Sequence, residues 1–154
     1  MTEILFYHLE QAGLEDVLPG LLERTRERGW KALVRVSSEE RLEALDAHLW
    51  TYKEESFLPH APSSDQRAAE QPVILTTSQE NPNGATVAFY ADGAAPDDWA
   101  APSLSTFQRV VLLFDGRDPS ATEAAREYWK QARATGFETT YWQQSATGKW
   151  EKKA

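Results

Sequence analysis

The chain has 154 residues, a length typical of one domain. Its 41% hydrophobic and 26% charged residues exclude a disordered or collagen-like chain. The 24 acidic and 16 basic side chains give a formal charge of −8, which disfavours general binding to a nucleic-acid backbone. The absence of cysteine excludes a disulfide framework, a thiolate zinc site and a cysteine nucleophile.

We expect a cytoplasmic protein with no membrane partner. No stretch approaches the ~20 apolar residues of a membrane span. The sequence opens Met1-Thr2-Glu3, with neither a basic region nor a cleavage site of the signal-peptide type. We further expect a single domain over residues 1–154, with a short basic C-terminal extension over about 144–154.

The first part of the chain predicts alternating strands and helices. The apolar run 4–7 is typical of a buried strand. Apolar residues then recur at helical spacing over 14–22. A proline is tolerated in a helix without loss of a hydrogen bond only within the first turn, so Pro19 predicts a helix start near Glu15 or Asp16.

A second strand and helix follow directly. Residues 32–36 predict the strand, and the buried stripe of the helix consists of Leu42, Leu45 and Leu49. The order strand, helix, strand, helix with short joins is typical of a parallel sheet. Residues 56–71 then predict a long surface connection.

The second half of the chain predicts four strands and one long helix. Strands 72–76 and 85–90 are joined through an Asn-Gly pair, which supplies the positive φ of a tight turn and suggests a hairpin. Residues 109–114 are the most apolar strand and therefore a central one. A helix from Asp118 or Ser120 to about residue 135, closed by a glycine, precedes a strand over 137–143. Residues 149–153 follow as a final strand or tail.

These elements predict an α/β fold: a single three-layer domain with a largely parallel mixed sheet flanked by helices. The topology is Rossmann-like, but the junction after the first strand, residues 8–13, carries only one glycine. No GxxxxGK[ST] sequence occurs either. We therefore expect no phosphate-binding loop and no cofactor.

The sequence shows little sign of catalysis. Its three histidines, His8, His48 and His60, are too widely spaced to suggest a metal site. His8 and Asp115 each end a predicted strand, where ligands bind in open α/β sheets, so an enzyme acting on a small or nucleotide ligand is the alternative function. Polar residues at strand ends more often bond to neighbouring backbone or cap a helix, and we favour that interpretation.

Two surface features stand out. The first is aromatic: Trp50 lies at a helix end and Phe57 in the loop beyond it. Trp50 is turned about 100° from Leu49, at the edge of the apolar stripe. If Trp50 is exposed beside Phe57, the two would form an interface hot spot. If both side chains are buried, they simply cover the core. Periodicity alone favours neither interpretation.

The second feature is electrostatic. Residues 1–116 carry 9 basic and 19 acidic side chains, whereas residues 117–154 carry 7 basic and 5 acidic ones. In the basic part, Arg126, Lys130 and Arg133 follow one another at helical spacing beside Trp129. Such a helix edge is suited to an acidic peptide with an apolar end, although a solvated helix face is the simpler interpretation.

Several segments together carry a more specific signal. They are the opening Phe6-Tyr7, the LDxxLW pattern of residues 45–50, the ESFxPH pattern of residues 55–60, and Ala125-Arg126-Glu127 leading through Lys130 to Gly136-Phe137. In this order and spacing the chain resembles the chi subunit of bacterial DNA polymerase III, a component of the clamp-loader complex, over nearly its whole length.

The resemblance implies a non-catalytic adaptor in DNA replication. In the family, the Trp of LDxxLW and the Phe of ESFxPH contact the psi subunit of the clamp loader, here Trp50 and Phe57. The family is a monomer or a heterodimer with psi, and it meets DNA only indirectly, through the acidic, phenylalanine-ended tail of single-stranded DNA-binding protein.

The same resemblance implies where that tail binds. The residues at the family's tail-binding positions are here Arg126, Trp129 and Lys130. Trp129 stands where well-studied relatives have Tyr, and Thr122 stands where they have a basic residue one helical turn before the arginine. The expected partners are therefore psi and the tail of single-stranded DNA-binding protein.

Overall fold

A computed structural model describes residues 2–10, 13–51, 60–78 and 80–153. The strands are β1 Glu3–Leu9, β2 Ala32–Arg35, β3 Ala61–Pro62, β4 Val73–Thr76, β5 Val87–Tyr90, β6 Arg109–Asp115, β7 Glu138–Gln144 and β8 Trp150–Lys152. The helices are α1 Leu14–Glu27, α2 Glu39–Thr51 and α3 Pro119–Thr135, with short 3₁₀ turns at Ala68–Glu70 and Pro102–Thr106.

The strands of the described residues form one sheet in the order β3-β4-β2-β5-β6-β1-β7-β8. Every neighbouring pair is parallel except β7 and β8, which are antiparallel. The prediction of a largely parallel mixed sheet in an α/β fold is thus confirmed, as is the interior position of the apolar strand β6, between β5 and β1.

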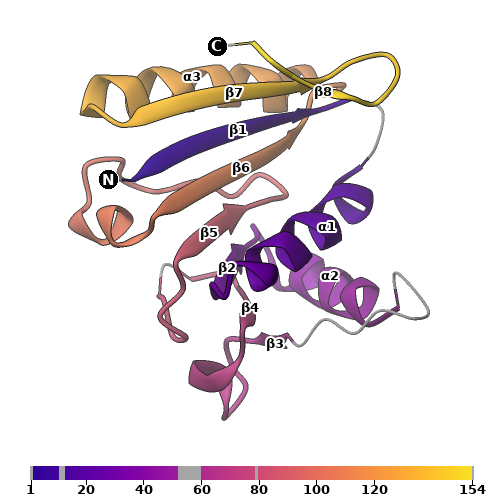
Figure 1. Cartoon of the computed structure of the whole chain (residues 1–154), viewed down its shortest axis with the longest axis vertical. Coiled ribbons are helices and arrows are strands. Elements are labelled where there is room, and N and C mark those ends of the chain that lie inside the picture. Colours follow the sequence, from indigo (N-terminus) through magenta and orange to yellow (C-terminus); the bar gives the residue numbers. More distant parts are fainter. Residues whose placement is uncertain (1, 11–12, 52–59, 79, 154) are drawn as a thin grey trace.

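The helices lie on both faces of this sheet. Figure 1 shows α1 and α2 together on one side, with α3 running along β7 and β1. Leucines of α1 and α2 pack against Leu5, Val34 and Val111 on one face. On the other face, Ala132 of α3 packs with Ile4 and Leu112. Both cores form because strand side chains alternate between the two faces.

The predicted hairpin of residues 72–90 is wrong. β4 and β5 do not pair with each other, because β2 lies between them and is parallel to both. The Asn-Gly turn belongs to a crossover connection. Within it, the main-chain oxygens of Ser78 and Glu80 accept hydrogen bonds from the buried guanidinium of Arg35, at 3.0 and 3.1 Å. The Asn-Gly turn therefore does not by itself mean that β4 and β5, the strands before and after it, pair with each other.

α1 also differs from the prediction. It begins at Leu14, so Pro19 lies inside the helix, beyond the first turn. The missing N–H of Pro19 leaves the main-chain oxygen of Glu15, four residues earlier, without its helical partner. The Nε2 atom of His48 in α2 lies 2.7 Å from that oxygen and donates to it. The tertiary contact replaces the helical bond that the proline removes.

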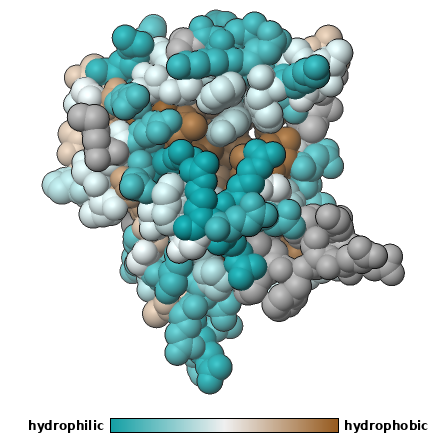
Figure 2. Space-filling view, in the orientation of Figure 1, coloured by the Kyte–Doolittle hydropathy of each residue, from teal (hydrophilic) through white to brown (hydrophobic). Residues whose placement is uncertain are grey.

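The surface is predominantly polar. In the orientation of Figure 1, apolar residues are visible mainly in hollows between long hydrophilic side chains (Figure 2). Of the helices in the described part of the chain, none has the length and apolar character needed to cross a bilayer.

Candidate functional site

The basic residues singled out in the sequence lie on α3, whose ends are fixed by local signals. Asp118 precedes the helix and its side chain accepts a hydrogen bond from the N–H of Ser120 at 3.0 Å. Pro119 occupies the first turn, where its missing N–H costs nothing. Gly136 ends the helix in the left-handed conformation, with φ 97°. The predicted boundaries of this helix are confirmed.

α3 presents a cationic edge beside an aromatic surface. Ala125 and Ala132 are buried against the sheet, while Arg126 and Lys130 are exposed. Trp129 is half-buried between these two sets. Its indole packs edge-on against Phe6 of β1, with 5.4 Å between ring centroids, and the guanidinium of Arg133 lies 5.6 Å from its ring centroid. The structure therefore brings Arg126, Trp129 and Lys130 together on one edge of the helix.

Tyr141 of β7 forms the floor next to this edge. Its ring packs edge-on against Trp129, with 5.8 Å between centroids. Burial raises the pKa of the Tyr141 phenol, whereas the positive charge of nearby Arg126 acts to lower it. Arg126 is therefore close enough to act electrostatically on Tyr141. No motif in the sequence pointed to Tyr141, because β7 reaches α3 only through the tertiary fold.

Tyr141 is anchored from below by His8. The hydroxyl of Tyr141 lies 2.7 Å from Nδ1 of His8, a buried residue at the end of β1. On the other side of the ring, Nε2 of His8 lies 3.0 Å from a carboxylate oxygen of Glu10. That second approach is not a hydrogen bond. Gln143 donates to the same Glu10 oxygen at 2.9 Å.

The imidazole of His8 also explains Gly116. A Cβ atom at position 116 would overlap the His8 ring and lie 2.9 Å from the main-chain oxygen of Leu9. Only glycine leaves that space open, and the N–H of Gly116 donates to the oxygen of Leu9 at 2.7 Å. The turn between β6 and α3 is thereby packed directly onto the end of β1. His8 thus bonds to a side chain, the phenol of Tyr141, rather than to neighbouring main chain or a helix end.

The alternative site, His8 with Asp115, is not formed. In the parallel register of β1 and β6, His8 is paired with Phe114 and Asp115 with Leu9. Side chains alternate along a strand, so His8 and Asp115 point to opposite faces of the sheet. Asp115 instead accepts hydrogen bonds from the main chain and guanidinium of Arg117, which hold the pKa of its carboxyl below the ordinary range.

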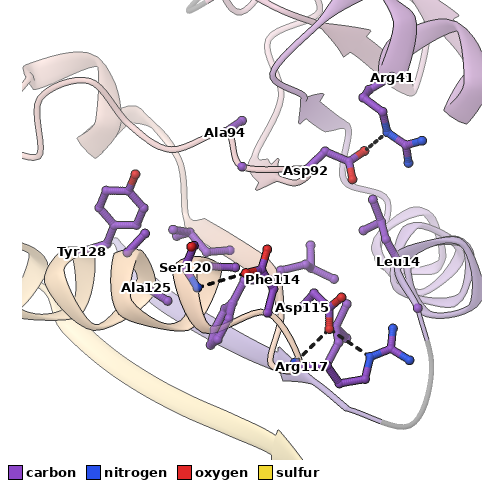
Figure 3. Close-up of a pocket in the computed structure, with 18 of the residues that line it drawn as sticks. Leu14, Arg41, Asp92, Ala94, Phe114, Asp115, Arg117, Ser120, Ala125 and Tyr128 are labelled. Carbon is purple, nitrogen blue, oxygen red and sulfur yellow. Dashed lines mark hydrogen bonds and ion pairs between the residues drawn. The ribbon is translucent and has the colours of Figure 1, made fainter.

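A cleft of about 640 Å³ does lie at the carboxyl ends of β1, β5 and β6. Figure 3 shows Ala125 and Tyr128 of α3 on one side of it and Leu14 of α1 on the other. Five of its charged groups pair with one another, and Asp118 caps α3. Arg41 contacts both Glu15 and Asp92, at 3.1 and 3.0 Å, and His8 is not part of the lining. Among the described residues, no group of three or more His, Cys, Asp or Glu is placed to hold a metal ion.

The first aromatic feature lies elsewhere in the fold. Trp50, in the last turn of α2, is 48% exposed, and its ring packs against that of His60 at a tilt of 38°, with 4.2 Å between centroids. His60 is buried and bonds through Nε2 to the main-chain oxygen of Asp46 at 3.1 Å. Leu42, Leu45 and Leu49 face the core as predicted. Trp50 therefore stands on the surface, whereas Phe57 lies outside the described residues.

A second group of cations was missed in the sequence. Arg24 of α1, Arg28 directly after that helix and Arg109 of β6 surround Trp30 and Tyr7. The guanidinium groups of Arg28 and Arg109 lie 5.2 and 5.5 Å from the Trp30 ring centroid. Burial raises the pKa of the Tyr7 phenol, and the three arginines oppose that rise. Sequence spacing links Arg24 with Arg28 but does not link them to Tyr7 of β1 or Arg109 of β6, which only the fold brings to this place.

The described residues thus define an α/β domain with a Rossmann-like parallel sheet, distinguished by aromatic and basic surface patches. The family model described as DNA polymerase III chi subunit, HolC, matches residues 1–140. The chain belongs to this family, whose polymerase acts in DNA replication. The expectation drawn from the sequence motifs is confirmed at this level.

Two curated relatives agree with this assignment. The chain is 26% identical over 120 residues to the "Probable DNA polymerase III subunit chi" of Rickettsia prowazekii (strain Madrid E), covering 75% of this chain and 71% of the relative. It is 25% identical over 140 residues to the "DNA polymerase III subunit chi" of Pseudomonas aeruginosa, covering 89% of this chain and 93% of the relative.

Proposed function

We propose that this protein is a non-catalytic adaptor that links the clamp loader, through the psi subunit, to the acidic C-terminal tail of single-stranded DNA-binding protein. The observation that carries the proposal is the separation of two surface patches. Trp50 lies on α2, which packs over β3 and β4, whereas Arg126 lies on α3, which packs over β6, β1 and β7 on the opposite face. The two patches therefore leave separate surfaces for two partners.

The chemistry of the α3 edge supports the tail as one partner. A peptide that ends in phenylalanine needs a cation for its terminal carboxylate and an apolar surface for its ring. A guanidinium pairs with a carboxylate through two parallel hydrogen bonds, and the guanidinium-bearing side chain of Arg126 is exposed to solvent. Trp129 and Tyr141 supply the adjacent aromatic surface. Lys130 is available to an acidic residue upstream.

The exposure of Trp50 supports the second partner. Large aromatic side chains of this kind dominate the energetics of protein interfaces when a partner covers them. In the family, the Trp of the LDxxLW motif contacts psi, so we assign Trp50 to the psi interface. Phe57, in the ESFxPH motif, joins the same proposal on the sequence alone.

Titration calorimetry with a short peptide of several aspartates and a C-terminal phenylalanine tests the α3 site. We expect binding to the wild type and roughly tenfold or greater loss in Arg126→Ala, because the terminal carboxylate loses its bidentate partner. Arg67→Ala, at an exposed arginine next to the far edge strand β3, is the matched control and should bind like the wild type. Equal affinity of the Arg126→Ala variant and the wild type would exclude this site.

Co-purification with psi tests the other patch. Trp50→Ala should lose psi while it retains the peptide, and Arg126→Ala should show the reverse pattern. Because Trp50 is half exposed, its removal leaves the buried stripe of α2 intact. Loss of both partners in either variant would indicate unfolding rather than two separate interfaces, and the thermal midpoint of each variant distinguishes the two explanations.

A further inference from the structure

The C-terminal strand β8 lies beyond the part of the chain that the family model matches, residues 1–140. It forms the last strand of the described sheet, with no further strand outside it. The segment around β8 carries Lys149, Lys152 and Lys153 against a single acidic residue, Glu151. The outer edge of the sheet is therefore basic in a molecule that is acidic as a whole.

The main chain of β8 has hydrogen-bonding groups that point away from the sheet. The N–H of Lys153 donates to the oxygen of Tyr141 at 2.8 Å. In an antiparallel pair such bonded residues alternate with unbonded ones. In the register of β7 and β8, the unbonded positions are Lys152, opposite Trp142, and Trp150, opposite Gln144. The N–H and C=O groups of Trp150 and Lys152 therefore face outward, where an extended chain can pair with them.

The side chains of β8 alternate between the two faces of the sheet. Trp150 packs on Tyr7, with 4.9 Å between ring centroids, on the face that carries α1. Lys153 is opposite Tyr141 and shares its face, which is the face of α3. Adjacent strands are about 4.8 Å apart, so Lys153 stands one strand beyond Tyr141. Tyr141 thus has Arg126 on the helix side and Lys153 on the edge side.

The position of Lys153 compensates for a positive charge that α3 does not carry. Thr122 occupies the position one turn before Arg126, and its hydroxyl is engaged with the main-chain oxygen of Asp118 at 3.1 Å. The helix therefore offers no cation there. Lys153 supplies a positive charge near the same aromatic floor from the opposite side. β7, which packs against α3, lies between the cations of α3 and the lysines of β8.

We propose that the outer edge of β8 binds the run of acidic residues in the same peptide whose terminal phenylalanine docks at Arg126. This inference rests on the proposed function. The acidic run adds to β8 as an extended strand, so that successive carboxylates alternate between the two faces. One set meets Lys152 on the face of α1, and the other meets Lys153 on the face of α3. A second copy of this chain is disfavoured as the occupant, because its own β8 would bring lysines against lysines.

Calorimetry at low salt with the same aspartate-rich peptide tests the charges. We expect Lys152→Glu/Lys153→Glu to weaken binding roughly tenfold, and the difference to shrink as salt is raised. The control Arg26→Glu/Arg67→Glu makes the same change in net charge at exposed sites away from β8 and should change binding less than about twofold. If both double variants weaken binding equally, the effect is one of overall charge and the inference is wrong.

Two further variants test the site in opposite directions. Glu151 lies 3.9 Å from the ammonium of Lys153 and competes for it, so Glu151→Gln should strengthen binding of the peptide. Lys152→Pro removes an N–H that faces away from β7, so it leaves the β7 ladder intact. It should weaken binding more than Lys152→Ala does. Equal affinity of Lys152→Pro and Lys152→Ala would overturn strand addition.

A second peptide separates this inference from the proposed function. In it, asparagine replaces each aspartate and the terminal phenylalanine is kept. Arg126→Ala should still weaken its binding, whereas the β8 charge variant Lys152→Glu/Lys153→Glu should bind it like the wild type. If the wild type binds neither peptide, the proposed function fails. If Arg126→Ala weakens the acidic peptide but the β8 charge variants do not, only the inference about β8 fails.

Discussion

The Nε2 atom of His48 donates to the main-chain oxygen of Glu15 across a distance of 2.7 Å. A carbonyl oxygen can only accept, so His48 carries its proton on Nε2. The oxygen is available because Pro19 has no N–H to offer it. One histidine of α2 thereby completes the backbone hydrogen bonding of α1 and joins the two helices on one face of the sheet.

A double-mutant cycle tests this coupling. His48→Ala should lower the free energy of unfolding by about 1 kcal/mol, because it leaves the Glu15 oxygen without its partner. In the Pro19→Ala background the same change should cost less, since residue 19 then supplies a helical N–H. Urea unfolding of the four proteins gives the coupling energy. Additive effects would show that His48 does not compensate for the proline.

Gly116 provides a test of the packing beneath the α3 site. Gly116→Ala should destabilise the fold by about 1–3 kcal/mol, because the new Cβ overlaps the His8 imidazole. His8→Ala removes that ring and should relieve part of the cost, although contact with the Leu9 oxygen at 2.9 Å remains. Chemical denaturation of the single and double variants measures both terms. Undiminished destabilisation in the double variant would place the strain elsewhere.

The tail-binding site should distinguish arginine from lysine. Arg126→Lys keeps the positive charge but loses the planar pair of donors that fits a carboxylate. We expect binding of the phenylalanine-ended peptide to weaken roughly tenfold, while its salt dependence is retained. Calorimetry at two salt concentrations checks this. Wild-type affinity in Arg126→Lys would mean that charge alone accounts for binding.

The buried tyrosines predict a loss of stability at alkaline pH. Burial raises the pKa values of Tyr7 and Tyr90 above the ordinary value, so the folded protein holds these protons more tightly than the unfolded chain. Their contribution is fully present below about pH 10 and is lost as pH rises through the folded pKa. Unfolding free energy should therefore fall above that pH. In Tyr7→Phe, which cannot ionise at this position, the fall should be shallower, and an unchanged slope would contradict the assignment.

Local sequence patterns were sufficient to predict the ends of a helix and its core-facing side, because interactions within a few residues of the chain determine both. The ends of α3 were predicted because Asp118 and Gly136 act on their own turns of the chain. The core stripe of α2 was predicted because helical periodicity places Leu42, Leu45 and Leu49 on one side. For the same reason, the grouping of Arg126 with Lys130 was evident before the fold was known.

Relationships between distant elements required the tertiary structure. The register of β1 and β6 decides that His8 and Asp115 point to opposite faces, and the position of β2 decides that β4 and β5 do not pair. Neither depends on spacing along the chain. The sequence by itself thus determined an acidic α/β protein of the chi family with a basic final quarter. Only the fold placed Tyr141 beside α3 and Lys153 opposite Tyr141 at the edge of the sheet, because sheet pairing joins residues that the sequence keeps apart.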